Sequence, residues 1–231
     1  MHTILKFPVT TKFAFLSDIH YGHDREFLWK PRGFNSVDEH SEFIVDNWRK
    51  HIDEDTIVFN LGDICFNDAK GNNFRMISNL PCKTQYVLWG NHCSGQNQCY
   101  KEAKETFFND LGVTNIPDVE IYPLPFNNMV FCGNDLVIRI GKTEVHLSHF
   151  AKRIWDHMAN RKSLHFSGHS HGNDSGRNPS TGTGKCLDVG IENAINETGN
   201  IFFTYEQLVD ILDKREVELH DHHDTSTQPS R

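Results

Sequence analysis

The sequence predicts a layered α/β protein, with helices outside and either one mixed sheet or two stacked sheets inside. Short apolar runs rich in β-branched and aromatic residues recur along the chain. They are mostly apolar rather than alternating, which is typical of strands buried on both faces. Stretches with helical periodicity lie between them, and this interleaving favours a layered α/β architecture.

Five strand-like runs each lead into a polar segment. The strands are expected at 13–16, 56–60, 84–89, 143–147 and 164–166, and the segments that follow are SDIHYGH, LGD, GNH, SHF and SGHSHG. Helices are expected at 37–52, 72–80, 100–111 and 204–215. Within 128–149 we expect close-set strands with turns at 133–135 and 141–142, a pattern typical of hairpins.

The bulk composition is that of one domain. The 231 residues fit a domain at 1–215 and a polar C-terminal tail at 216–231, which we expect to be flexible. The net charge of −8 weighs against a nucleic-acid partner without excluding one, because it leaves no wide basic face. No apolar run approaches the roughly 18 residues of a membrane-spanning helix, and the N-terminus lacks the pattern of a secretory leader. We therefore expect a cytoplasmic protein with reduced cysteines and no membrane partner.

The five polar segments carry side chains suited to metal binding. These are Asp18, His20, Asp63, Asn91, His92, His149, His169 and His171. Each lies just beyond the carboxyl end of a strand, where open α/β sheets form their binding crevices. Carboxylate, amide and imidazole ligands without a thiolate suit divalent first-row metals.

Seven of these residues, all except His92, are more ligands than one zinc ion would take. Split between two ions, with Asp63 as the bridge, they give each ion about four protein ligands and leave room for water. Two dications with two carboxylates and one hydroxide keep roughly one net positive charge, which favours a phosphate group. The residues by themselves therefore indicate a two-metal site for a phosphoester.

Taken in order, these motifs resemble those of the calcineurin-like metallophosphoesterases. They are D-x-H at 18–20, G-D at 62–63, G-N-H at 90–92, an isolated His149 and G-H-x-H at 168–171. The fuller strings look most like the small single-domain branch found in bacteria and phages, so the cytoplasm would be that of the host if a phage encodes the chain. The resemblance covers residues 13 to about 190. It implies a four-layer α/β/β/α sandwich, with two mixed sheets flanked by helices.

The resemblance also implies a role for each residue. Asp18, His20, Asp63 and His171 would hold one ion, and Asp63, Asn91, His149 and His169 would hold the other. Asn91 and His92 would contact the substrate, and His92 would either protonate the leaving oxygen or stabilise its charge. The reaction implied is hydrolysis of a phosphodiester, in a nucleotide or another small phosphoester, by a metal-bridging hydroxide, with Asp63 and His92 as catalytic residues. Two divalent ions are expected, manganese first, with iron, zinc or nickel as alternatives.

One position departs from the pattern of this family. The family usually has G-N-H-D, and this chain has Cys93 after His92. The missing carboxylate would orient the histidine and support its charge, and a thiol replaces it poorly unless it is ionised. This departure puts the acid role of His92 in question and favours substrates with a good leaving group.

Other residues have both a functional and a structural interpretation. His23 is expected at the substrate or in a supporting hydrogen bond, and Arg153 at a phosphate oxygen or on a surface helix. His165 is expected to be structural, and Trp155 to pack in the core or the pocket wall. Arg25, Lys30 and Arg32 could form a rim around the substrate, but a solvated loop is the favoured interpretation.

Several classes of function remain open at this point. A phosphomonoesterase or protein phosphatase and a nuclease are the enzymatic alternatives to a phosphodiesterase. A non-catalytic metal-binding scaffold and a metal-storage protein are the alternatives to an enzyme. The presence of all seven ligands favours an enzyme over a scaffold, and His92 beside Asn91 has no purpose in storage. The sequence does not indicate an oligomeric state.

Overall fold

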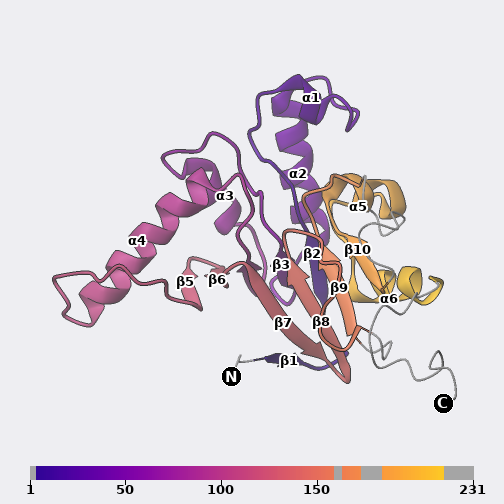
Figure 1. Cartoon of the computed structure of the whole chain (residues 1–231). Coiled ribbons are helices and arrows are strands. Elements are labelled where there is room, and N and C mark those ends of the chain that lie inside the picture. The colour runs from indigo at the N-terminus through magenta and orange to yellow at the C-terminus, as the bar shows by residue number, and fades with distance from the viewer. Residues whose placement is uncertain (1–3, 159–162, 173–183, 216–231) are drawn as a thin grey trace, which may run out of the picture.

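The strand-like runs assemble into two mixed five-stranded sheets in the computed structural model, which describes residues 4–158, 163–172 and 184–215 (Figure 1). In the first sheet β5 is antiparallel to β6 and the other pairs are parallel; its order is β2 (Phe13–Leu16), β3 (Ile57–Asn60), β4 (Thr84–Val87), β6 (Met129–Phe131) and β5 (Leu124–Phe126). In the second sheet β7 and β8 are antiparallel and the other pairs are parallel; its order is β1 (Leu5–Phe7), β7 (Asp135–Ile140), β8 (Thr143–Ser148), β9 (Ser163–Ser167) and β10 (Cys186–Asp188). The predicted α/β class with two stacked sheets is therefore confirmed.

The two sheets pack face to face through large apolar side chains. Alternate residues of a strand face opposite sides of its sheet, and Phe15 and Phe59 of the first sheet share a buried cluster with Leu147 and Phe166 of the second. Phe15 stacks on Phe59 with ring centroids 5.1 Å apart and meets Phe166 edge-on at 5.0 Å. These contacts fix the ends of strands from both sheets relative to one another.

Three helices cover the other face of the first sheet. α2 (Val37–His51), α3 (Asn72–Ser78) and α4 (Ser94–Asp110) bury Trp48, Phe74 and Cys99 in one cluster with Ala14 and Leu16 of β2. The short helix α1 (Glu26–Trp29) contacts α2, while α5 (Ile191–Thr198) and α6 (Tyr205–Asp213) lie beside β10 (Figure 1).

The outer face of the second sheet is covered differently. In the described part of the chain, the segment 150–158 lies on this face, where Trp155 packs on His165 with ring centroids 5.2 Å apart. Trp155 and Met158 form a small buried cluster with Cys186 of β10. His165 and Trp155 are thus structural residues, as the sequence predicts.

Several local predictions differ from the structure. The turn at 141–142 joins β7 to β8 as a hairpin, but the turn at 133–135 does not form one, because β6 and β7 belong to different sheets. Local turn chemistry does not distinguish a chain reversal from a crossing between sheets. α4 begins at Ser94 rather than at 100, and α5 was not expected.

The predicted tail at 216–231 lies outside the described residues. Within the described ranges, no helix combines the length and the apolar character that a membrane crossing requires.

The packing of Phe59 leads to a stability prediction. This side chain is fully buried between the sheets, so Phe59→Ala is expected to lower the free energy of unfolding by roughly 3–5 kcal/mol. The matched control is Phe27→Ala, because Phe27 is 74% exposed and its loss should change stability by no more than about 0.5 kcal/mol. Urea unfolding measures both variants, and equal effects would contradict the assignment of Phe59 to the core.

Candidate metal centre

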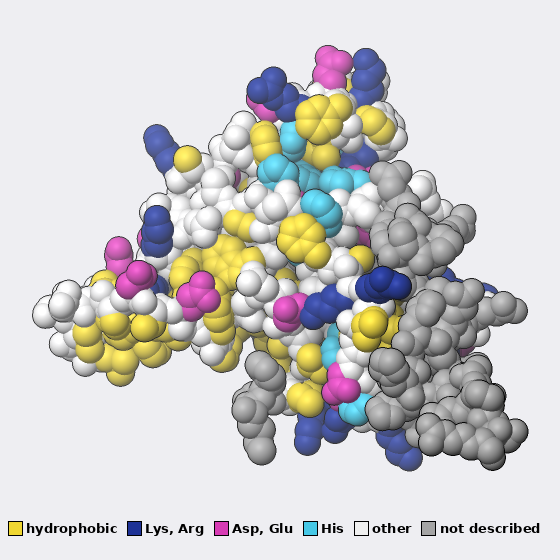
Figure 2. Space-filling model, viewed as in Figure 1, with side chains coloured by type: hydrophobic (Ala, Val, Ile, Leu, Met, Phe, Trp, Pro, Cys, Tyr) yellow, Lys and Arg dark blue, Asp and Glu magenta, His cyan; other side chains and the backbone are white. Residues whose placement is uncertain are grey.

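The predicted ligands meet where strands of both sheets end. Asp18 and Asp63 follow β2 and β3 of the first sheet, and Asn91 follows β4. His149 follows β8 of the second sheet, and the loop after β9 carries His169 and, two residues further on, His171. Figure 2 shows histidine side chains gathered on the face of the molecule below α1.

The loops that carry the ligands share an uncommon backbone conformation. Eight non-glycine residues of the described chain have a positive φ angle, and five of them are predicted ligands. They are Asp18 (φ 58°), His20 (46°), Asp63 (53°), His169 (69°) and His171 (50°). This region is costly for residues with a Cβ atom, and such strain concentrates at functional sites.

Two carboxylate-to-backbone hydrogen bonds hold these loops together. Asp18 Oδ2 accepts from the backbone N–H of His169 at 2.8 Å, and Asp63 Oδ1 accepts from that of His92 at 2.8 Å. Each aspartate therefore uses one oxygen to fix a histidine-bearing loop and leaves the other for the centre. Gly90 and Gly168 permit this close approach, because a Cβ atom at either would collide with the Asp63 or Asp18 carboxylate.

Asp18, His20 and His171 form the first group of potential ligands. Asp18 Oδ1 is 3.9 Å from His20 Nε2 and 4.0 Å from His171 Nε2. Asp18 Oδ1 and both nitrogens of His20 are buried and have no hydrogen-bond partner. Two donors each about 2.1 Å from one ion lie roughly 3–4 Å apart, depending on the angle between the bonds. The spacing and the orphaned atoms both fit a cation at this position.

The second group contains Asp63, His149, Asn91 and His169. His149 Nδ1 lies 2.9 Å from the carbonyl oxygen of Leu61, which can only accept, so Nδ1 carries the proton. In the neutral ring Nε2 then presents a lone pair toward Asn91 Oδ1 at 3.0 Å and Asp63 Oδ2 at 3.4 Å. With His149 neutral, one nitrogen and two oxygen acceptors converge without a proton to share, and a cation would satisfy all three. Burial lowers the pKa of His149, but the hydrogen bond to Asp63 and the charges of Asp18 and Asp63 outweigh it and raise this pKa, because without a cation a proton on Nε2 takes that place.

Asp63 lies between the two groups. Its Oδ2 atom is 3.8 Å from His20 Nε2 in the first group and 3.4 Å from His149 Nε2 in the second. The potential ligand atoms of Asp63, His149 and His169 all lie within 4.8 Å of one another, as do those of Asp18, His20 and His171. The geometry therefore brings all seven predicted ligands together, with Asp63 next to both groups.

The charges and burial of these side chains point the same way. Burial raises the pKa of Asp18 to about 6 and, with the nearby Arg32 charge, lowers the pKa of His20. Burial would also raise the pKa of Asp63, but the hydrogen bond and charge of His149 outweigh it and hold that pKa at about 2. A cation would favour the carboxylate form of Asp18 and the neutral form of His20, which are the forms that bind metals.

Sequence reasoning missed the residues that orient His171. Glu192 Oε1 lies 2.6 Å from His171 Nδ1, so Nδ1 donates and Nε2 faces the centre. Arg32 Nη2 contacts the same oxygen at 2.5 Å and donates to the backbone oxygen of Asp18 at 2.8 Å. The solvated loop expected at Arg32 is wrong for this residue, whose side chain is 1% exposed. No local pattern pairs Arg32 with a glutamate 160 positions away.

A second missed carboxylate shapes the loop after β9. Asp188 is buried at the end of β10 and accepts hydrogen bonds from Ser170 Oγ and from the backbone N–H of Gly172 and Gly190. These bonds anchor the loop around His171. Asp188 lies at the end of a strand-like run, and the predicted ligands also lie at the ends of such runs. This position was the signal in the sequence that could have identified it.

The remaining predicted site residues occupy different surroundings. His23 is 2% exposed, stacks on Phe66 with ring centroids 3.9 Å apart, and lies 5.6 Å from the ring of His20. His92 is exposed, and its ring is 5.4 Å from that of His20. Arg153 is exposed in the segment after His149, and within the described residues no hydrogen bond or ion pair joins it to a predicted ligand. Arg25 and Lys30 are exposed around α1, as expected for a solvated loop.

The chain is thus an α/β protein of two stacked sheets, with neighbouring groups of histidine and aspartate side chains that could hold metal ions. No family model matches the chain. The chain is similar to the uncharacterized protein MJ1445 of Methanocaldococcus jannaschii, with 27% identity over 81 residues. That match covers 35% of this chain and 46% of the relative, so the chain spans about half the length of the curated relative it matches.

A solved structure resembles the whole fold. The crystal structure of AQ665, a protein of unknown function from Aquifex aeolicus, matches with a TM-score of 0.51 and 15% sequence identity. The match covers 87% of this chain and 98% of that one. At this identity the likeness shows a shared fold.

The Glu192–His171 contact leads to a prediction about metal affinity. Glu192→Gln is expected to weaken Mn²⁺ binding roughly 10- to 100-fold, because carboxylates that orient a ligating histidine commonly contribute that much. Glu197→Gln is the matched control, since Glu197 is exposed on the same helix and should leave the affinity unchanged. Isothermal titration calorimetry measures both, with thermal unfolding as a check on folding. Unaltered affinity in a folded Glu192→Gln protein would contradict the orienting role.

Proposed function

We propose that the chain is a metal-dependent phosphoric ester hydrolase of the calcineurin-like metallophosphoesterase superfamily. Its substrate would be a phosphodiester, in a nucleotide or another small phosphoester. The observation that carries the proposal is the position of Asp63, whose Oδ2 atom faces His20 of one ligand group and His149 of the other. A site for a single structural ion does not need two such groups around one carboxylate.

The proposal extends to the four-layer α/β/β/α sandwich of that superfamily. The two stacked sheets and the helices on the first sheet support it. Over the second sheet, the packing of Trp155 on His165 and beside Cys186 supports a fourth layer that would include the segment 150–158.

The donor set determines which ions fit. Imidazole, carboxylate and amide donors suit divalent first-row metals, and we propose manganese first, with iron, zinc or nickel as alternatives. Asp18, His20 and His171 would hold one ion, His149, His169 and Asn91 the other, and Asp63 both. When bound, two divalent ions supply activation of water and neutralisation of phosphoryl charge.

His92 would act on the substrate from the rim of the centre. Its backbone is fixed by the hydrogen bond to Asp63, and its exposed ring can reach a phosphoester bound beside the ligands. There it would donate a proton to the leaving oxygen or stabilise its charge. Cys93 Sγ donates to the carbonyl oxygen of Gly90 at 2.9 Å, and burial raises the pKa of this thiol to about 11. A protonated Cys93 therefore gives His92 no charge support, which favours substrates with good leaving groups.

A diester suits the surroundings better than a monoester. A diester carries one negative charge at neutral pH, and a monoester carries about two. The cavity beside Asn91 and His92 has no lysine or arginine in its lining to meet the additional charge. Arg32 is committed to Glu192 and to backbone oxygens.

The proposed activity has a direct test. Purified protein with Mn²⁺ is expected to hydrolyse bis(p-nitrophenyl) phosphate, and a chelator should abolish the reaction. Asp63→Asn is expected to lower kcat at least roughly 1,000-fold, because both ions lose their shared ligand and its charge. Asp110→Asn, at the exposed end of α4, is the control and should keep the full rate.

Two results would contradict the proposal. One is the absence of turnover with Mn²⁺, Fe²⁺, Zn²⁺ and Ni²⁺ on both this diester and p-nitrophenyl phosphate. The other is near-normal turnover by Asp63→Asn, which would separate any activity from the centre.

A further inference from the structure

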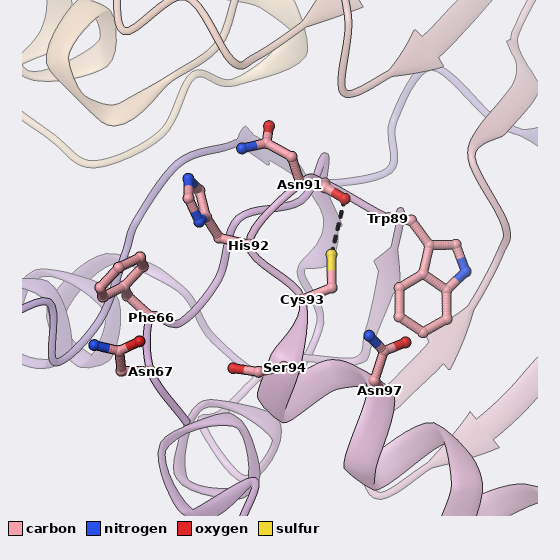
Figure 3. Close-up of a pocket in the computed structure, with 9 residues that line it drawn as sticks. Phe66, Asn67, Trp89, Asn91, His92, Cys93, Ser94 and Asn97 are labelled. Atoms are coloured by element: carbon pink, nitrogen blue, oxygen red, sulfur yellow. Dashed lines mark hydrogen bonds between the residues drawn. The ribbon is translucent and has the colours of Figure 1, made fainter. Parts of the chain in front are cut away.

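A cavity opens directly beside the candidate metal centre. It has a volume of about 560 Å³, within the roughly 300–1,000 Å³ typical of small-molecule sites. Asn91 and His92 belong to its lining, so a group attached to a phosphate at the centre can enter it. Figure 3 shows the cavity between the loop after β3, which carries Phe66, and the start of α4.

Two fixed aromatic rings stand on opposite sides of this cavity (Figure 3). Phe66 is held by stacking on His23 at 3.9 Å. Trp89 stacks on Phe131 at 5.9 Å, and its Nε1 atom donates to the hydroxyl of Tyr122 at 2.6 Å. Because both rings are supported from behind, they offer preformed walls for a flat apolar group.

Apart from His92, the polar side chains of the lining are neutral. Asn67 and Asn97 contribute amides, and none of the nine lining residues is an aspartate, glutamate, lysine or arginine. Asn67 has a φ angle of 48°, a strained conformation for a residue with a Cβ atom. Cys93 stands in this lining where the related family has a carboxylate, so the departure removes an acidic side chain from the wall.

We propose that this cavity binds the nucleoside part of the substrate, with its base on the aromatic walls and its polar edge at the amides of Asn67 and Asn97. The proposal rests on the proposed phosphodiesterase function, which places the phosphate at the centre. Nucleosides combine a flat aromatic ring with neutral donors and acceptors, which matches the lining. A second phosphate or a carboxylate finds no lysine or arginine there, and the one basic side chain, His92, would serve the phosphate at the centre. The substrate class is therefore a nucleoside phosphodiester.

The first test compares diesters that differ only in one group. With Mn²⁺, thymidine 5′-(p-nitrophenyl phosphate) is expected to show a kcat/KM roughly 10- to 100-fold above that of methyl p-nitrophenyl phosphate, since stacking of a base on an aromatic side chain commonly contributes that much. Both esters have the same charge and the same leaving group. Equal kcat/KM values for the two would overturn the nucleoside assignment and leave the phosphodiesterase proposal intact.

Two variants connect the preference to the cavity. Asn97→Ala is expected to lower kcat/KM about fivefold for the thymidine ester and not for the methyl ester, because one hydrogen bond is lost. Asn109→Ala is the matched control, an exposed asparagine further along α4 that should change neither value. Phe66→Leu keeps an apolar side chain but removes the ring, and it should reduce the preference for the thymidine ester. An unchanged preference in both cavity variants would overturn the proposal.

A binding measurement separates this inference from the proposed activity. Thymidine alone is expected to bind the metal-free protein in saturation-transfer NMR, and Asn97→Ala should weaken the signal while Asn109→Ala should not. Absence of thymidine binding overturns the cavity assignment even if diesters are hydrolysed. Absence of all hydrolysis overturns the proposed function, and thymidine binding then still decides on the cavity. Inhibition by oligothymidylate and by a mononucleotide is then compared, to learn whether the natural substrate is the end of a nucleic-acid strand or a free nucleotide. Stronger inhibition by either compound supports a nucleoside site.

Discussion

A hydrogen bond from a backbone N–H to an aspartate side chain joins loops of the two sheets and determines the shape of the centre. Asp18, at the end of β2 in the first sheet, accepts from the backbone N–H of His169, after β9 in the second. One carboxylate oxygen thus joins loops from different sheets, and the other faces the ligand position. The same arrangement recurs within the first sheet, where Asp63 accepts from the backbone of His92. Both aspartates define loop positions as well as contributing potential ligands.

This arrangement is costly for the fold, and the packing around it offsets the cost. Five of the predicted ligands have positive φ angles, and Asp18 and His20 are buried with unpartnered polar atoms. The large apolar contact between the sheets stabilises the fold and holds the strand ends in place, which offsets the strain in the loops. The Arg32–Glu192 pair shows a similar relation, because a buried ion pair adds little stability but orients the groups that it touches. Here it orients His171 and fixes the backbone of Asp18.

The sequence was sufficient for features that depend on neighbouring residues. Each ligand follows an apolar run of strand length, so both the strand and the position of its ligand follow from a few adjacent residues. Contacts between residues that are distant in the sequence were not predictable in this way. Arg32 was expected in a solvated loop ahead of the first predicted helix, and its partner Glu192 lies in α5, a helix that was not expected. The turn at 133–135 was misread for the same reason, since the sheet that receives the next strand is decided by distant contacts. The cavity beside His92 also brings together residues of different loops. Of its nine lining residues, only Asn91 and His92 were predicted from the sequence as site residues.

The central claim is that Asp63 lies between two bound ions. Anomalous X-ray diffraction from crystals grown with Mn²⁺ tests this claim most directly. We expect two anomalous peaks about 3.5–4 Å apart, one on each side of the Asp63 carboxylate. One peak should lie next to Asp18, His20 and His171, and the other next to Asn91, His149 and His169. A single peak, or two peaks of which neither contacts Asp63, would contradict the account.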